Sequence, residues 1–217
     1  MKNYYHLITE EQEDLRQMVR EFADKEIIPT AKTCEIDGTF PKELYRKAFE
    51  MGLTTFTLPE KFGGVGGDIF TYALIKEELA RGDAGFSGTV AGAYMGIVPI
   101  KIAGNDYHWK LAADVLTNGG LMSFALTEPN VGSDAAALRT KYVKDGDSVI
   151  LNGRKGFISN GAVSNLYTVF ATLDPSLGAK GISFILANMY MKLAAARQMV
   201  WHSCCCADAG NLRRKAF

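Results

Sequence analysis

The sequence lacks the features that mark several common classes of protein. Lysine plus arginine number 24 and aspartate plus glutamate number 24 in 217 residues, so the formal net charge is zero. A balanced charge gives no general attraction for nucleic acid or for an acidic membrane surface. No apolar run approaches the roughly 20 residues that cross a bilayer. We therefore predict a protein that binds no nucleic acid and has no membrane span.

A targeting segment is also absent from the expected places. Residues 1–10 have no apolar core, and they continue into an acidic helix rather than into an arginine-rich, acid-poor transit sequence. The simplest interpretation is a protein that stays where it is made, in the cytoplasm.

Cysteine is scarce and poorly spaced for metal binding. The four cysteines are Cys34 and the consecutive run Cys204, Cys205 and Cys206. Neighbouring residues on a helix point about 100° apart, so the run cannot converge on one ion. Because no CxxC pair is present either, the sequence predicts no metal site.

The first 120 residues carry the apolar spacing of helices. Thr9 and Gln12 form a capping box before the first helix, which Pro29 is expected to close. Pro41 suits the first turn of the second helix, and Gly52 ends it.

Three further helices are expected before residue 120. One starts near Asp68, with Glu77 and Glu78 on its solvated exterior. The next, over 86–103, is apolar almost all round and is therefore predicted to be buried. The last begins at Asp106.

After residue 120 the pattern changes to short β-rich runs between turn signals. Asp145-Gly146 separates two such runs and predicts a hairpin. A helical period returns over 182–206, although residues 180–184 would fit a strand of the sheet while 182–189 equally fits the start of the helix. The prediction is an α+β fold: an all-α domain over 1–120, a small antiparallel, barrel-like sheet domain over 121–181, and one long helix within 182–217.

The segment 124–134 reads FALTEPNVGSD and is the most informative stretch of the chain. A strand leads into a turn that has hydroxyl groups and a glycine beside it. Such a turn can hold a phosphate or the polar edge of a ring. On the residues alone, an ordinary hairpin turn with satisfied hydroxyls is the favoured alternative.

This segment resembles the flavin-binding signature of acyl-CoA dehydrogenases, in which Thr-Glu-Pro precedes a small pair and Gly-Ser-Asp. Val131 departs from that pattern, where the family has a small residue. Three other stretches resemble the same family in the same order: LPEKFGG at 58–64, PIKIAGN at 99–105 and NGRKGFISNG at 152–161. Four ordered matches are far more specific than one motif.

The resemblance implies FAD as cofactor and assigns roles to particular residues. The flavin edge would be bound by the Leu126 backbone and by Thr127, with Phe124 against it. Gly132 and Ser133 would serve the pyrophosphate or the pantetheine arm of the substrate. Phe157, a tryptophan in the family, would cover one flavin face, with plain sheet core as the alternative. Ser159, usually threonine, would reach the N5–O4 edge, and Tyr94 and Met95 would line the acyl pocket.

The implied activity is α,β-dehydrogenation of an acyl-CoA thioester, with electrons passed to an electron-transferring flavoprotein. The implied assembly is a homo-oligomer, typically a tetramer. The family's catalytic base is a glutamate of a C-terminal helical domain, and no stretch here resembles that segment; Glu128 matches a structural residue. A second hypothesis is therefore a truncated or internally deleted, catalytically silent remnant that acts as a scaffold or binding module.

Overall fold

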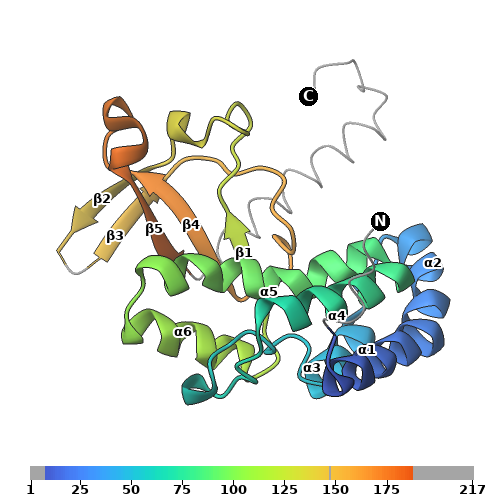
Figure 1. The fold of residues 1–217 in the computed structure, drawn as a ribbon. Coiled ribbons are helices and arrows are strands. Elements are labelled where there is room, and N and C mark those ends of the chain that lie inside the picture. Colours follow the sequence, from blue (N-terminus) through green and yellow to red (C-terminus); the bar gives the residue numbers. More distant parts are fainter. Residues whose placement is uncertain (1–7, 147, 188–217) are drawn as a thin grey trace, which may run out of the picture.

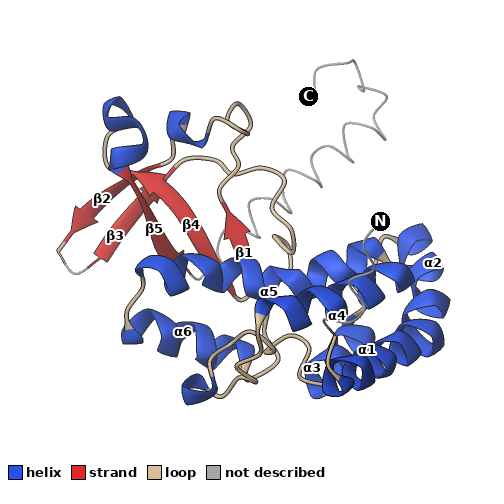
Figure 2. Cartoon of the chain, in the orientation of Figure 1, coloured by secondary structure: helices blue, strands red, loops and turns tan. Residues whose placement is uncertain are grey.

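A computed structural model describes residues 8–146 and 148–187 (Figure 1). Within these residues, six α-helices are followed by a five-stranded sheet, which confirms the α+β order of the prediction. Figure 2 shows the two layers, with the strands above one central helix and most other helices below it.

The first helix does not end where its proline predicts. α1 (Glu10–Phe22) begins with the expected capping box: the Gln12 N–H donates to Thr9 Oγ1 at 3.2 Å, and the Thr9 N–H donates to Gln12 Oε1 at 3.1 Å. A π-helical turn (Ala23–Ile27) then leads directly into α2 (Ile28–Asp37), with Pro29 in its first turn. Inside a continuous helix a proline ring lacks an N–H and crowds the preceding turn, and the wider π turn accommodates it.

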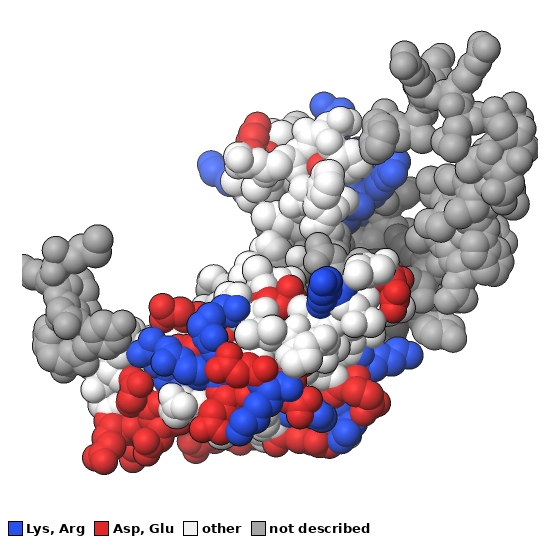
Figure 3. Space-filling model, turned by 90° about the vertical axis from the view of Figure 1, so that its right-hand side faces the viewer, with Lys and Arg blue, Asp and Glu red and all other residues white. Residues whose placement is uncertain are grey.

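The remaining helices lie close to their predicted positions. They are α3 (Lys42–Glu50), α4 (Ile69–Gly82), α5 (Ala84–Ala103) and α6 (Asp106–Leu116). Asp68 caps α4, because its Oδ1 accepts the Thr71 N–H at 2.9 Å. Acidic and basic side chains intermingle over the helical layer in the lower part of Figure 3.

Helix α5 is the central element of the fold. It packs against α4 and α6 on one side and against β1 and β4 on the other. Among the described helices it is the one long and apolar enough to cross a membrane, contrary to the expectation that no such run exists, and half of that window is buried. Burial between two layers accounts for its apolar composition.

Glu78 corrects another expectation. Glu77 is exposed as predicted, but Glu78 is only 1% exposed because it faces α1. Its carboxylate accepts from Arg16 Nε at 2.9 Å, Arg20 Nη2 at 2.6 Å and Arg81 Nε at 3.1 Å. The spacing of apolar residues had placed Glu78 on the solvated exterior of the helix, and two arginines of α1 make its burial possible.

The sheet is mixed rather than wholly antiparallel. Its strands are β1 (Met122–Ala125), β2 (Lys141–Asp145), β3 (Ser148–Asn152), β4 (Leu166–Thr172) and β5 (Ile182–Ala187). The pairs β2–β3 and β4–β5 are antiparallel, whereas β4 pairs in parallel with β1 and, at its far end, with β2. The β2–β3 pair confirms the hairpin predicted from Asp145-Gly146, and Gly146 has the left-handed φ of +58°.

The helix predicted to begin at residue 182 is wrong for Ile182–Ala187. These residues form β5, which pairs with β4 from Ile182↔Thr172 to Ala187↔Tyr167. The open edge of β4 decides between the two structures that the local pattern allowed. The rest of the predicted helix lies outside the described residues.

A tight seam joins α5 to the sheet. Thr168 Oγ1 donates to the Gly96 carbonyl at 2.7 Å, and Asn160 Nδ2 donates to the Thr89 carbonyl at 2.9 Å. A Cβ at Gly92 would overlap Asn160 Nδ2 and lie 2.9 Å from the Met122 carbonyl oxygen. Glycine on α5 therefore allows the sheet to approach the helix backbone.

Candidate functional site

Two segments singled out by the sequence lie side by side in the structure. The Gly156 N–H donates to the Thr127 carbonyl at 3.0 Å, and Ser123 Oγ donates to the Ser159 carbonyl at 2.7 Å. These bonds join β1 and the segment that follows it to the segment 155–160, which follows β3. Leu126 and Thr127 are thereby placed on a segment adjoining Phe157 and Ser159.

Phe157 is the most unusual residue of this surface. Its side chain is 94% exposed, and its φ is +56°, a left-handed conformation that a bulky residue rarely adopts. Such a conformation costs about 1–3 kcal/mol and is found mainly at ligand sites. The alternative that Phe157 belongs to the sheet core is wrong, because the ring lies in solvent.

The predicted hydroxyl groups are accessible. Thr127 is half-buried, whereas Ser133 and Ser159 are exposed, as is Gly132. Ser133 follows a tight turn closed by reciprocal backbone hydrogen bonds between Glu128 and Val131, at 3.0 and 3.1 Å. The hydroxyls of Thr127 and Ser159 can bind the polar edge of a planar group, and an exposed aromatic ring can cover its face.

Phe124 is less free than the resemblance implies. Its ring centroid lies 5.0 Å from that of Phe170 on β4, and the side chain is half-buried. The ring is thus already engaged on the sheet surface. Its role against a flavin stays a prediction.

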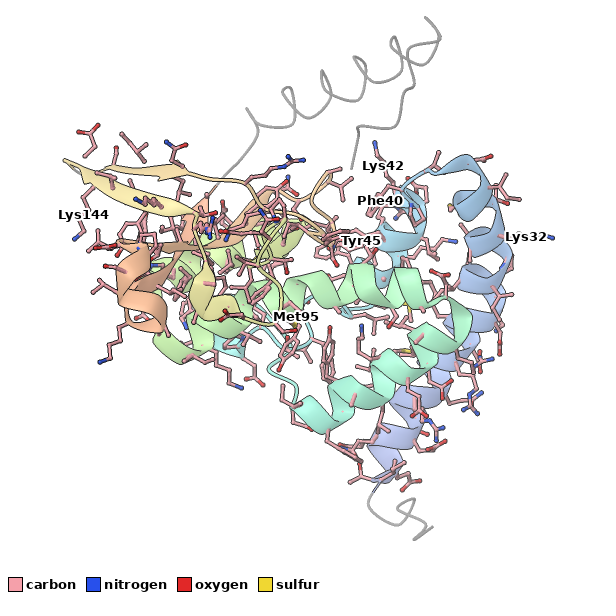
Figure 4. The ribbon with its side chains drawn as sticks, turned by 90° about the horizontal axis from the view of Figure 1, so that it is seen from above. Lys32, Phe40, Lys42, Tyr45, Met95 and Lys144 are labelled. Carbon is pink, nitrogen blue, oxygen red and sulfur yellow. The ribbon has the colours of Figure 1, made fainter. Side chains whose placement is uncertain are left out.

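The two predicted acyl-pocket residues face different surroundings. The Tyr94 ring packs in a tilted pair with Tyr72 of α4 at 5.1 Å, inside the helical layer. Met95 is exposed at the middle of α5 (Figure 4). Successive residues on a helix point about 100° apart, which accounts for the different surroundings of the two side chains. Their role in lining an acyl pocket stays a prediction.

The larger of two described cavities, about 650 Å³, lies elsewhere, between α3, the α6–β1 turn and residues 163–165. Its walls include Phe40, Lys42 and Tyr45, which are labelled in Figure 4. Tyr45 donates to the Gly120 carbonyl at 3.0 Å, and burial raises the pKa of Tyr45 to about 12. No predicted cofactor residue lines this cavity or the second one.

An ion pair that the sequence analysis did not identify lies under this surface. Lys155 Nζ is 2.9 Å from Glu128 Oε1, with exposed fractions of 9% and 7% for the two side chains. Lys155 also donates to the Leu126 carbonyl at 2.9 Å. Glu128 accepts the backbone N–H groups of Arg139 and Thr140 at 2.9 and 2.8 Å.

The environment keeps Glu128 ionised. Burial alone would raise the pKa of this carboxyl, but hydrogen bonds from Thr140, Lys155 and Arg139 outweigh it and lower the pKa to about 2. Burial lowers the pKa of Lys155, and Glu128 offsets part of that change. With its oxygens engaged, Glu128 is not placed to take a proton from a substrate. The geometry agrees with the structural role that the resemblance implied.

Two residues near the site were missed at the sequence level. Lys155 and Asn160 both lie in the stretch 152–161, and Asn160 has a φ of +60° while its side chain binds α5. A lysine in one motif and a glutamate in the other gave a signal for pairing, but their proximity depends on the fold. Among the described residues, no three His, Cys, Asp or Glu side chains are grouped to hold a metal ion.

Comparison with known families identifies both domains. Residues 9–110 match the model of the acyl-CoA dehydrogenase N-terminal domain, and residues 123–201 match that of the acyl-CoA dehydrogenase middle domain. The second match continues past Ala187, through part of the stretch for which a long helix was predicted.

Individual relatives give the same result. The chain is 39% identical over 184 residues to an acyl-CoA dehydrogenase of Bacillus subtilis, a match that covers 83% of this chain and 48% of the relative. Butyryl-CoA dehydrogenase from Megasphaera elsdenii is similar in structure, with a TM-score of 0.77, 33% identity and coverage of 84% and 49%. A solved structure described as the electron transferring flavoprotein of Acidaminococcus fermentans is also similar, with a TM-score of 0.79 and 35% identity. That match covers 85% of this chain and 49% of the other. The chain thus spans about half the length of these relatives.

Proposed function

Because the chain belongs to the acyl-CoA dehydrogenase family, we propose that it takes part in the FAD-dependent α,β-dehydrogenation of an acyl-CoA thioester. Members of this family are flavoprotein oxidoreductases of fatty acid metabolism and are typically tetrameric. The proposed share of this chain is to hold the cofactor and to form part of the substrate surface.

The observation that carries the proposal is the position of Phe157. An aromatic ring stands in solvent on a left-handed backbone, beside the segment of Leu126 and Thr127. A planar, partly apolar ring system would cover that exposed face, and nearby hydroxyls would bind its polar edge. The residues present therefore fit a flavin.

The remaining residues have complementary tasks in this proposal. Thr127 and Ser159 would bind the ring edge, and Ser133 with Gly132 would bind the pyrophosphate or the pantetheine arm. When bound, FAD supplies the acceptor for the hydride that leaves the β-carbon of the thioester. Backbone donors near Leu126 would orient the ring relative to the substrate.

The catalytic base has no candidate among the described residues of this surface. Glu128 is committed to Lys155 and to two backbone N–H groups. No described residue of this surface is therefore assigned the abstraction of the α-proton. Transfer of electrons to an electron-transferring flavoprotein, assembly into a homo-oligomer and a cytoplasmic location stay predictions.

Flavin binding tests the proposal most directly. The purified chain is titrated with FAD, and binding is followed by the visible absorbance and by quenching of flavin fluorescence. Saturable binding that Thr127→Val and Phe157→Ala both weaken supports the proposal. An exposed-site control, Lys144→Met on β2, is expected to bind FAD as the wild type does.

Addition of an acyl-CoA to the FAD complex without oxygen separates the two hypotheses further. A flavin band that keeps its absorbance is expected, because no described residue of this surface takes the α-proton. Bleaching would show that the chain also supplies a base. Failure to bind any FAD would overturn the proposal and favour the silent remnant.

A further inference from the structure

Three segments that are distant in sequence meet at the buried pair of Lys155 and Glu128. Glu128 belongs to the turn after β1, Lys155 to the segment after β3, and the Arg139 and Thr140 N–H groups to the approach to β2. None of these positions lies inside a regular strand. Side chains therefore supply the partners that a β-ladder would otherwise provide.

We infer that Lys155 is a positioning residue for the flavin site: it holds the Leu126 carbonyl and the 155–160 segment in the arrangement that presents Phe157 and Ser159 to the cofactor. This inference rests on the proposed function. It assigns to Lys155 no contact with the cofactor itself.

The hydrogen bonds of successive residues make the arrangement rigid. Lys155 Nζ binds the Leu126 carbonyl, and the next residue, Gly156, donates its N–H to the next carbonyl, that of Thr127. The 155–160 segment cannot rotate relative to the Thr127 segment without breaking both bonds. Phe157 directly follows Gly156, so the hydrogen bond of Gly156 fixes the backbone on the N-terminal side of Phe157.

Burial of the pair gives the lysine its specific importance. The side chains of Lys155 and Glu128 are only 9% and 7% exposed, so water cannot replace either partner well. If Lys155 were neutral, Glu128 would keep a negative charge beneath the predicted ring-binding surface. A negative charge there disfavours addition of electrons to a bound flavin, which gives the inference an electrochemical readout.

The variant Lys155→Met tests the inference in the full chain, with Lys155→Arg as the conservative replacement. The double variant Glu128→Gln/Lys155→Met removes both charges. It leaves no unpaired buried charge, so it controls for an effect of Lys155→Met that comes only from unfolding. Lys144→Met, on the exposed face of β2 in Figure 4, is the matched control. Circular dichroism establishes that each variant is folded.

Hydrogen exchange reports on the segment without any cofactor. In Lys155→Met the N–H of Gly156 is expected to exchange at least tenfold faster, while that of Val169 in β4 keeps its wild-type rate. Lys155→Arg is expected to restore slow exchange. Unchanged exchange at Gly156 would overturn the inference.

Two flavin measurements separate positioning from a purely structural role. In Lys155→Met the Kd for FAD is expected to rise at least tenfold, and the reduction potential of the bound flavin is expected to become more negative. The double variant should bring the potential back towards the wild-type value, because no unpaired charge remains. Lys144→Met should change neither quantity.

The outcomes distinguish the two claims. If wild type binds FAD and Lys155→Met binds it with the same Kd and potential, the inference is wrong while the proposed function stands. If wild type takes up no FAD, the proposed function fails, and the role assigned to Lys155 fails with it.

Discussion

The helical layer and the sheet each bury one carboxylate, and the two carboxylates have different partners. Glu78 accepts from the side chains of Arg16, Arg20 and Arg81, which extend from α1 and α4. Glu128 accepts from one lysine and from two backbone N–H groups of irregular segments. Glu78 links helices whose backbone hydrogen bonds are already made within each helix. Glu128 instead binds backbone segments that belong to no strand pair. Loss of Glu78 should therefore lower only the stability of the fold. Loss of the pair formed by Glu128 and Lys155 should also lower the affinity of the candidate site for FAD.

Acid gives the largest expected effect, because it removes both charges. Hydrogen bonds from Arg20, Arg81 and Arg16 lower the pKa of Glu78 from 4.5 to about 2, and the pKa of Glu128 is also lowered from 4.5 to about 2. A carboxyl whose pKa is lower in the folded state stabilises the protein above its unfolded pKa, and that stabilisation is lost as protons bind. The free energy of unfolding should fall by several kcal/mol as pH decreases from 4.5 to 2.

Urea denaturation at a series of pH values measures this loss, and Glu78→Gln should remove the part that comes from the helical layer. An unfolding free energy that stays constant over this interval would contradict the lowered pKa values of both groups.

The next effect is confined to the helical layer. Glu78→Ala leaves three arginines around a buried position without their shared partner, which should cost about 3 kcal/mol at neutral pH. Arg20 and Arg81 are 37% and 40% exposed, so water compensates part of the loss. Urea denaturation checks the value, and Glu77→Ala at the exposed neighbouring position is the control. FAD affinity, corrected for the fraction of folded protein, should not change. A tenfold loss of affinity would mean that Glu78 affects the site as the Glu128 pair does.

A substitution at the seam tests how closely the two regions are joined. Gly92→Ala would place a Cβ against Asn160 and the Met122 carbonyl, and overpacking of this kind costs about 1–3 kcal/mol. Gly88 lies on the same helix, and a methyl group added there would meet no atom within 4 Å, so Gly88→Ala should stabilise by about 0.5–1 kcal/mol. Opposite shifts in Tm are the expected result. Equal shifts would mean that the seam is looser than the contacts indicate.

The smallest effect on stability is expected at Phe157. Phe157→Gly relieves the left-handed strain but makes the unfolded chain more flexible, so stability should rise by at most about 1 kcal/mol. Loss of the ring should weaken FAD binding by up to about tenfold. Val143→Gly on exposed β2 is the control, with lower stability and unchanged affinity. A large loss of stability in Phe157→Gly would show that the ring packs in the fold rather than serving a ligand.

The contrast between the two carboxylates also shows where sequence reasoning succeeds. The capping box of Thr9 and Gln12 and the hairpin at Asp145-Gly146 were predicted because both depend on residues a few positions apart. The segments that form the site were found because their motifs are contiguous. Periodicity failed at Glu78, since whether a helix face is solvated depends on the helix packed against it.

The amino-acid sequence by itself determined the order of helices and strands, the caps and turns, and the two stretches that carry the candidate site. Only the tertiary structure decided that Ile182–Ala187 is a strand, because the free edge of β4 supplies its hydrogen bonds. Only the tertiary structure paired Lys155 with Glu128, 27 residues apart, and left Phe157 in solvent. Local rules fix what neighbours along the chain can satisfy, and the remaining backbone groups and charges find partners only when distant segments meet.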